Sequence, residues 1–404
     1  MNGRLKQYYK SFPRQLWVLA AGSFVNSFGA ALVYPFLTLY LRQRLGIPLA
    51  QVGLLLTLNS ATGLVAGMVG GILADRIGRR TVMLISLLST SAVLFLMGVA
   101  TSFAHIAALM VAIGITSPLA QPARDAMVAD LTRPEQRTEA YSVLRISSNL
   151  GWATGPAIGG FLAGVSYLLS FGLAAGACFI FFALTLFLVR ETMPQSAQGG
   201  ASQSQAAGFR TVFRDAPFLL FCGLMVLTTI SYSQVMTNLP VYMKESFGLG
   251  ERYYGWVMTT NGAMVVGLQL WVTRATSKWP RLPALALGSM LYGIGVGAIG
   301  LMSSFPGFIL CAVIYTLGEV VVSPTATALT AAFAPADMRG RYMGVLGLTW
   351  GMAFGIGPML GGVIYDAGFV HALWLAAGGL ALVAAVGYLA LQRRARARIA
   401  PDSG

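Results

Sequence analysis

Residues 71–80 read Gly-Ile-Leu-Ala-Asp-Arg-Ile-Gly-Arg-Arg and close an apolar stretch that spans 51–74. An α-helix needs roughly 20 apolar residues to cross the hydrocarbon core of a bilayer, and this stretch is long enough. Loops retained on the cytoplasmic side of a membrane are rich in Lys and Arg, as this one is. The segment therefore predicts a transmembrane helix that ends in a basic cytoplasmic loop.

The rest of the chain repeats this pattern of apolar stretches separated by short charged loops. Of the 404 residues, 56% are hydrophobic and only 10% are charged, which is too little polar surface for a soluble fold. Twelve apolar stretches can be delimited, at 16–41, 51–74, 81–100, 104–129, 140–164, 168–189, 217–243, 252–273, 283–303, 307–333, 342–364 and 371–391. We therefore expect an all-α membrane protein with twelve transmembrane helices.

The distribution of basic residues predicts the orientation in the membrane. If the first residue lies inside, most of the 27 Lys and Arg fall in inner segments, and only Arg42, Arg44, Lys244 and Arg252 lie outside. We therefore expect a multi-pass protein of the inner (cell) membrane with both termini in the cytoplasm. The same bias accounts for the net charge of +14, so we expect the lipid bilayer, and not a nucleic acid, as the partner.

Residues 190–215 form the one long polar stretch and are rich in Gln, Ser, Gly and Ala. Such a composition buries too little apolar surface to fold, which predicts a flexible cytoplasmic linker. The linker divides the chain into an N-terminal six-helix bundle at 1–189 and a C-terminal six-helix bundle at 216–404.

The two predicted bundles share a sequence register. A shift of 202 residues brings Pro122 onto Pro324 and Arg137 onto Arg339. It also brings Gly155-Pro156-x-x-Gly159-Gly160 onto Gly357-Pro358-x-x-Gly361-Gly362. Matches at one offset indicate an internal repeat, although chance matching in Gly- and Ala-rich helices is the alternative. Six spans separate the copies, so the repeat is parallel, with its pseudo-two-fold axis along the membrane normal.

The loop after the second stretch resembles the signature G-x-x-x-D-R-x-G-R-R/K of the major facilitator superfamily. The matching residues are Gly71, Asp75, Arg76, Gly78, Arg79 and Arg80. We expect Gly71 to permit a close helix approach and Gly78 to permit a tight turn; a merely solvated basic loop is the alternative. The resemblance implies that Asp75 faces a helix N-terminus of the other half, and that Arg79 pairs with Asp130.

The stretch at 140–164 is similar to the G-x-x-x-G-P-x-x-G-G signature of the superfamily's twelve-span drug:proton antiporters. Its residues are Gly151, Gly155, Pro156, Gly159 and Gly160, preceded by Asn149. Small residues four positions apart let helices pack closely, and a proline bends a helix, so an ordinary packing helix has the same requirements.

One feature of that branch is missing. Its members carry a membrane-embedded arginine in the fourth span, about four residues before a glycine. In this chain Met110 occupies that position before Gly114. We take Arg145, in the fifth span, as the candidate substitute in proton coupling.

Glu319 lies near the middle of the stretch at 307–333. An acid at the bilayer centre costs roughly 2.5–3.5 kcal/mol on insertion scales, so it needs a partner, water or a proton. We predict that Glu319 is the proton-coupling acid and a substrate contact. The alternative is a static acid that a neighbouring helix neutralises.

Polar residues inside the predicted spans are candidate substrate contacts. In the resembled fold, spans 1, 4, 7 and 10 line a central cavity, which favours Asn26, Tyr34, Gln234 and Asn238; Asn149 in span 5 is a further candidate. Each could instead make an interhelical hydrogen bond. Two histidines at outer helix ends and three isolated cysteines provide neither a convergent catalytic set nor a metal site, so we expect no enzyme, no metal and no cofactor.

The resemblance implies a secondary active transporter that works by alternating access. The leading hypothesis is a monomeric, proton-coupled exporter of amphipathic or cationic small molecules, a multidrug efflux protein driven by the proton gradient. The alternatives are a proton symporter that imports a specific small metabolite, and an exporter of one endogenous metabolite.

Overall fold

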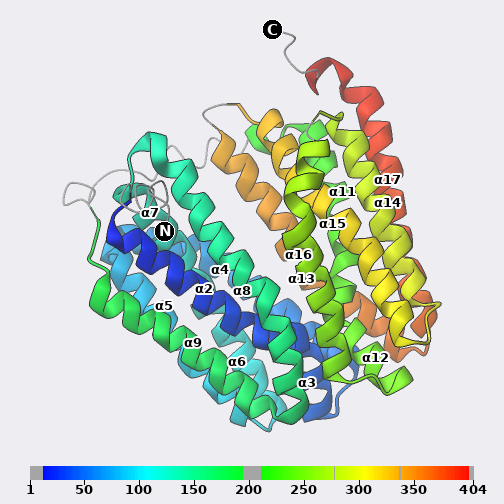
Figure 1. The fold of residues 1–404 in the computed structure, drawn as a ribbon, viewed down its shortest axis with the longest axis horizontal. Helices are drawn as coiled ribbons and strands as arrows, with labels where there is room; N and C mark the ends of the chain where they lie inside the picture. The colour runs from blue at the N-terminus through cyan, green and yellow to red at the C-terminus, as the bar shows by residue number, and fades with distance from the viewer. Residues whose placement is uncertain (1–11, 194–210, 277, 336–337, 400–404) are drawn as a thin grey trace. The chain divides into compact units, whose positions relative to one another are not determined.

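A computed structural model describes residues 12–193, 211–276, 278–335 and 338–399, and the regular elements of these residues are helices (Figure 1). Contacts divide the chain into two units. The first unit comprises 1–40 and 58–200, and the second comprises 41–57 and 201–404.

The helices of the N-terminal half are, in chain order, α2 (Arg14–Val33), η1 (Tyr34–Phe36), α3 (Leu37–Leu45), α4 (Leu49–Ile77), α5 (Arg79–Val99), α6 (Phe103–Thr116), η2 (Ser117–Leu119), α7 (Ala120–Leu131), η3 (Pro134–Gln136), α8 (Arg137–Val165) and α9 (Tyr167–Leu188). Those of the C-terminal half are α11 (Ala216–Thr237), α12 (Leu239–Phe247), α13 (Glu251–Thr276), α14 (Arg281–Ile299), α15 (Phe305–Phe333), α16 (Arg339–Asp366) and α17 (Val370–Ile399).

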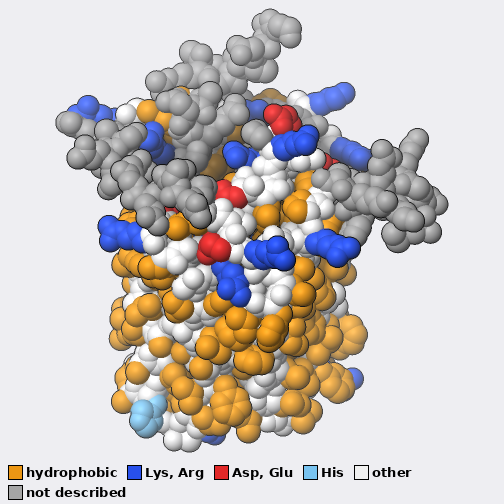
Figure 2. Space-filling view, turned by 90° about the vertical axis from the view of Figure 1, so that its left-hand side faces the viewer, with side chains coloured by type: hydrophobic (Ala, Val, Ile, Leu, Met, Phe, Trp, Pro, Cys, Tyr) orange, Lys and Arg blue, Asp and Glu red, His pale blue; other side chains and the backbone are white. Residues whose placement is uncertain are grey.

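Each predicted apolar stretch coincides with one of these helices or with two or three successive ones. In the described residues, ten helical segments are long and apolar enough to cross a membrane. The prediction of an all-α membrane protein is therefore confirmed. Two predicted spans, α8 and α13, are 29 and 26 residues long but are not among the ten, so their crossing stays a prediction. Figure 2 shows a broad band of hydrophobic side chains on one face of the molecule, with most of the visible charged side chains at one end of it.

Three of the predicted spans are broken at a proline. The stretch at 16–41 is interrupted by η1 at Pro35, that at 104–129 by η2 at Pro118, and that at 217–243 by the junction of α11 and α12 before Pro240. Proline lacks the backbone N–H and clashes with the preceding turn of a helix. Spans 1, 4 and 7 are thus not continuous α-helices, which corrects the expectation from hydropathy.

Equivalent helices of the two units make equivalent contacts. Within the first unit α2 packs on α8 and α9, and within the second unit α11 packs on α16 and α17. Likewise α5 packs on α9, and α14 on α17. These pairs correspond under the 202-residue shift, so the internal repeat is structural.

The boundaries 1–189, 190–215 and 216–404 stay a prediction, because most of the linker lies outside the described residues. Residues 41–57 belong by sequence to the first predicted bundle but pack with the second unit. The cytoplasmic orientation of the termini stays a prediction as well.

The helix α13 supplies hydrogen-bond donors at two of the prolines of the second unit. Pro324 lies inside α15, and the Val320 carbonyl that it leaves unpaired accepts a hydrogen bond from Gln269 Nε2 at 3.0 Å. Near Pro240, the Tyr254 hydroxyl donates to the carbonyls of residues 235 and 236 at 3.1 and 3.4 Å. In lipid such carbonyls need an internal donor, so α13 stabilises both neighbouring helices.

A double-mutant cycle tests this role of Gln269. Gln269→Leu should lower the free energy of unfolding by about 1 kcal/mol, because the Val320 carbonyl loses its donor. In a Pro324→Ala background the new backbone N–H supplies that donor, so the same substitution should cost much less. Thermal unfolding in one detergent compares the stability of the parent protein, the two single variants and the double variant. An equal loss of stability from Gln269→Leu in both backgrounds would contradict the role of Gln269 as donor to Val320.

Candidate functional site

Glu319 is partly buried on α15 and is held by an amide. Asn261 Nδ2, on α13, donates to Glu319 Oε2 at 2.7 Å and to Thr316 Oγ1 at 2.9 Å. Among the described residues, none of the ion pairs includes Glu319. Within the described residues the carboxylate thus has an amide partner and no ion-pair partner, and both the coupling role of Glu319 and the alternative of a static acid stay predictions.

Five aromatic rings lie together in the same unit. The ring of Tyr232 lies 5.6 Å from that of Tyr292 and 6.4 Å from that of Tyr315, both in T-shaped contacts. It also makes T-shaped contacts with Trp350 at 6.2 Å and Phe354 at 6.5 Å. Trp350 and Phe354 stack on each other at 5.9 Å. Four helices thus contribute to one aromatic group.

This aromatic group adjoins the acid. Glu319 lies within electrostatic range of Tyr232, Tyr292 and Tyr315, all of which are buried. The hydroxyl of Tyr315 is buried without a hydrogen-bond partner among the described residues, whereas Trp350 is 42% exposed. We call these five rings, with Glu319, Asn261 and Thr316, the Glu319 cluster. Aromatic faces beside a carboxylate attract organic cations.

The glycines of α8 form a packing face for α2 in the first unit. A Cβ on Gly155 would overlap that of Ala31, and one on Gly159 would lie 2.7 Å from the carbonyl oxygen of Leu32. Gly151 meets α2 in the same way, one turn earlier. Gly160 is buried, and Pro156 lies within the continuous helix. The packing interpretation of this motif accounts for these contacts, and the exporter interpretation stays a prediction.

The repeated motif on α16 receives the polar side chains of Gln234 on α11 and of Asn238, which joins α11 to α12. Gln234 Nε2 donates to the Gly357 carbonyl at 2.9 Å, and Asn238 Nδ2 donates to Gln234 Oε1 at 2.6 Å. A Cβ on Gly361 would overlap both amide side chains. Gln234 and Asn238 are both buried. The bond from Gln234 to Gly357 joins α11 to α16, whereas Asn238 bonds to Gln234, and the role of both residues as substrate contacts stays a prediction.

The remaining candidates lie in the first unit. Asn26 is half-buried on α2, and Tyr34 is 36% exposed with its ring 6.4 Å from that of Trp152. Arg145 and Asn149 are exposed and lie one turn apart on α8. The role of Arg145 in proton coupling stays a prediction.

Two expectations for the basic loop between α4 and α5 are confirmed, while the position of Asp75 against a helix N-terminus of the other half stays a prediction. Gly78 adopts a φ of 99°, the tight turn expected of this position. Arg79 forms an ion pair with Asp130, the pairing that the resemblance implied. Asp75 and Arg76 are exposed.

The role assigned to Gly71 was wrong. A Cβ on Gly71 would lie 4.0 Å from that of Pro122, an ordinary contact, whereas one on Gly70 would lie 3.1 Å from the Leu119 Cα. Because neighbouring residues of a helix point about 100° apart, the close approach belongs to the preceding glycine.

The sequence analysis missed Glu191, which follows α9. Its carboxylate accepts the backbone N–H groups of Arg79 at 3.2 Å and Arg80 at 3.0 Å, the first two residues of α5. No side chain caps α5 locally, since Gly78 is the N-cap residue. Glu191 thus caps the helix that starts in the basic loop. In the sequence it stands at the start of the polar linker, where it looks like an ordinary solvent-exposed charge.

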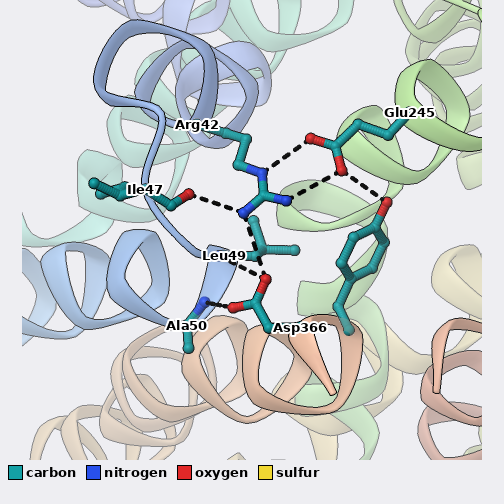
Figure 3. Close-up of polar contacts among 7 residues, drawn as sticks. Arg42, Ile47, Leu49, Ala50, Glu245 and Asp366 are labelled. Atoms are coloured by element: carbon teal, nitrogen blue, oxygen red, sulfur yellow. Dashed lines mark hydrogen bonds and ion pairs between the residues drawn. The ribbon is translucent and has the colours of Figure 1, made fainter. Parts of the chain in front are cut away.

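A second group that sequence analysis missed lies in the second unit (Figure 3). Arg42 binds both oxygens of Glu245, at 2.9 and 3.3 Å, and contacts Asp366 Oδ1 at 3.4 Å. Tyr365 donates to Glu245 Oε2 at 3.1 Å. A hollow of about 530 Å³ adjoins the group and is lined by Arg42, Gln43, Gly46, Pro48, Glu245 and Asp366.

Comparison with known proteins places the chain among membrane transporters. The family profile described as Major Facilitator Superfamily matches residues 19–250 and 221–404. The uncharacterized MFS-type transporter YttB of Bacillus subtilis is 30% identical over 387 residues, which cover 95% of this chain and 96% of that protein.

More distant relatives have named activities. The multidrug resistance protein MdtH of Aeromonas hydrophila is 28% identical, with 87% of each chain covered. A sodium, lithium, potassium/proton antiporter of Planococcus maritimus is 25% identical, with 87% of this chain and 89% of that protein covered. A POT family transporter crystallised with 5-aminolevulinic acid has the same fold, with a TM-score of 0.82 at 18% identity over 95% of this chain and 96% of the other.

The glycine face of α8 can be tested by adding one methyl group. Gly155→Ala should destabilise the protein by about 1–3 kcal/mol, because the new Cβ overlaps Ala31. Gly176→Ala on α9 is the matched control, since a Cβ there meets nothing within 4 Å and helix propensity favours alanine. Thermal unfolding compares the two variants, and a shift of both in the same direction would argue against the packing role.

Proposed function

The chain belongs to the major facilitator superfamily, and from this premise we propose that it is a proton-coupled exporter of cationic and amphipathic small molecules. It is a multi-pass membrane transporter of the cell membrane. The proposal adds the direction of transport, the class of substrate, the proton gradient as energy source, and alternating access as the mechanism.

The proposal rests on the position of Glu319 beside a group of aromatic rings, where it forms no ion pair with any residue that the structure describes. An ionised acid in an apolar surrounding is unfavourable by several kcal/mol until a cation or a proton neutralises it. A bound organic cation would be attracted by the carboxylate charge and would contact the aromatic faces of the exposed Trp350 and its stacked neighbour Phe354. Cation and proton would thus compete for one group.

Such competition is sufficient to couple two fluxes. If the protonated and the cation-bound forms of Glu319 favour different orientations of the transporter, each ligand shifts the same equilibrium in its own direction. The amide of Asn261 is suited to both forms, because an amide can donate to a carboxylate and accept from a carboxylic acid. The carboxylate would therefore remain hydrogen-bonded throughout the cycle.

The names of two relatives, a multidrug resistance protein and a cation/proton antiporter, agree with export and antiport. Import of a specific metabolite would need several ionic contacts in fixed positions. In the Glu319 cluster the carboxylate is the single charged member, which suits adaptable recognition of cations better.

Glu319→Gln tests the coupling role. In proteoliposomes with an imposed pH gradient, the rate at which the variant exports a tetraphenylphosphonium probe should fall about tenfold or more. The reason is that an amide can neither bind a proton nor neutralise a cation. Glu139→Gln, which alters an exposed carboxylate at the start of α8, is the control and should pump normally. Unchanged pumping by a folded Glu319→Gln protein would remove Glu319 from the mechanism.

Trp350→Leu tests the aromatic part of the cluster. Loss of a cation–π contact of about 0.5–2 kcal/mol should weaken binding of a quaternary ammonium ligand by about 2- to 30-fold. Binding of its uncharged isostere should change much less, and Trp279→Leu, at a tryptophan that is 48% exposed, should affect neither ligand. Equal losses for the charged and the uncharged ligand, measured by titration in detergent, would contradict cation recognition by this ring.

A further inference from the structure

Residues 41–57, which we call the outer segment, connect at both ends to helices of the first unit yet pack within the second. The segment contains the end of α3 and the first nine residues of α4, which continues to Ile77 in the first unit. A single helix therefore belongs to both units. Any movement between the units must either deform α4 or detach the outer segment.

The start of α4 has no capping residue of its own. The preceding residues, Gly46, Ile47 and Pro48, carry no side-chain acceptor for the unpaired N–H groups of the first turn. Instead, Asp366 of α16 accepts the backbone N–H groups of Leu49 at 3.0 Å and Ala50 at 2.7 Å (Figure 3).

Asp366 also has an electrostatic reason to remain at this position. It is the last residue of α16, where the helix dipole disfavours a negative charge, whereas the N-terminus of α4 favours one. Arg42 reinforces the contact: Nη1 donates to the Ile47 carbonyl at 2.8 Å, while the guanidinium binds Glu245 of α12 and contacts Asp366. Two helices of the second unit thus hold the outer segment.

Glycines on both helices continue the contact inward. A Cβ on Gly362 would lie 2.6 Å from the backbone of Leu49 and Ala50, and one on Gly53 would overlap the backbone of Met359. Thr57 donates to the Gly355 carbonyl. The two helices therefore run antiparallel along the outer segment, with Asp366 at its end.

We propose that Asp366, Arg42 and Glu245 form a latch that fastens the outer segment to α12 and α16 and that releases it in each transport cycle. The three side chains are 23%, 24% and 37% exposed, so water can replace their contacts and release is reversible. The role of the latch is independent of the substrate and of Glu319.

An introduced cysteine at a buried position of the outer segment can report release of the segment from α12 and α16. Val52 is fully buried on α4, and Val52→Cys replaces it with a smaller side chain. In nanodiscs, where both membrane faces are accessible, a hydrophilic maleimide should label this cysteine slowly. Asp366→Ala should speed labelling about five- to tenfold, the effect of losing a helix cap. Asp366→Asn, which keeps an acceptor but loses the charge, should lie between.

Ser102→Ala is the matched control, because it removes the side-chain cap of α6 within the first unit. It should leave the labelling rate unchanged, while Arg42→Gln should raise it. Thermal unfolding and size-exclusion profiles establish that each variant is folded. Labelling of folded Asp366→Ala and Arg42→Gln at the parent rate would overturn the latch, as would an equal increase in Ser102→Ala, which would indicate general loosening.

Discussion

Every backbone N–H and C=O inside a bilayer needs a partner within the protein, and the rest of this structure depends on that constraint. The chain meets it with helices, but several of the predicted spans contain prolines that remove a backbone donor. In the second unit, α13 supplies hydrogen-bond donors to two neighbouring helices, with Tyr254 beside one proline and Gln269 beside another. Asn261 lies between them on α13 and binds Glu319.

The polar side chains of α13 also explain why its composition is unlike that of most other spans. A helix that donates hydrogen bonds to α11 and α15 carries amides and hydroxyls where another span carries leucine. Its hydropathy is correspondingly low, and it is not among the ten helices apolar enough to cross a membrane by composition alone. The composition of α13 thus reflects its polar contacts to neighbouring helices.

Much of the architecture could be predicted from sequence, because hydropathy and the 202-residue repeat are properties of whole helices. The finer points could not. Pro240 and Pro324 look alike in sequence, yet a helix ends before the first and continues through the second. The close approach at Gly70 rather than Gly71 depends on helix rotation, which the spacing of glycines does not determine.

The carboxylate caps were missed for a different reason. Glu191 and the start of α5 are 112 residues apart, and Asp366 and the start of α4 are 317 apart, so no local pattern connects donor and acceptor. Each acid follows or ends a helix and resembles an ordinary loop charge. The sequence does show that the usual capping residues are missing, because neither α4 nor α5 is preceded by Ser, Thr, Asp or Asn. Each of these helix N-termini therefore needs an acceptor from elsewhere in the chain.

A carboxylate that caps a distant helix has different consequences at α5 and at α4. Glu191 and α5 belong to one unit, so the proposed transport cycle would leave their contact in place. Asp366 caps a helix that continues into the other unit, so in the transport cycle that we propose this contact would have to release. A helix N-terminus without a local cap can therefore serve as a rigid joint or as a switchable one. Which of the two it becomes depends on whether the acceptor and the body of the helix belong to the same unit.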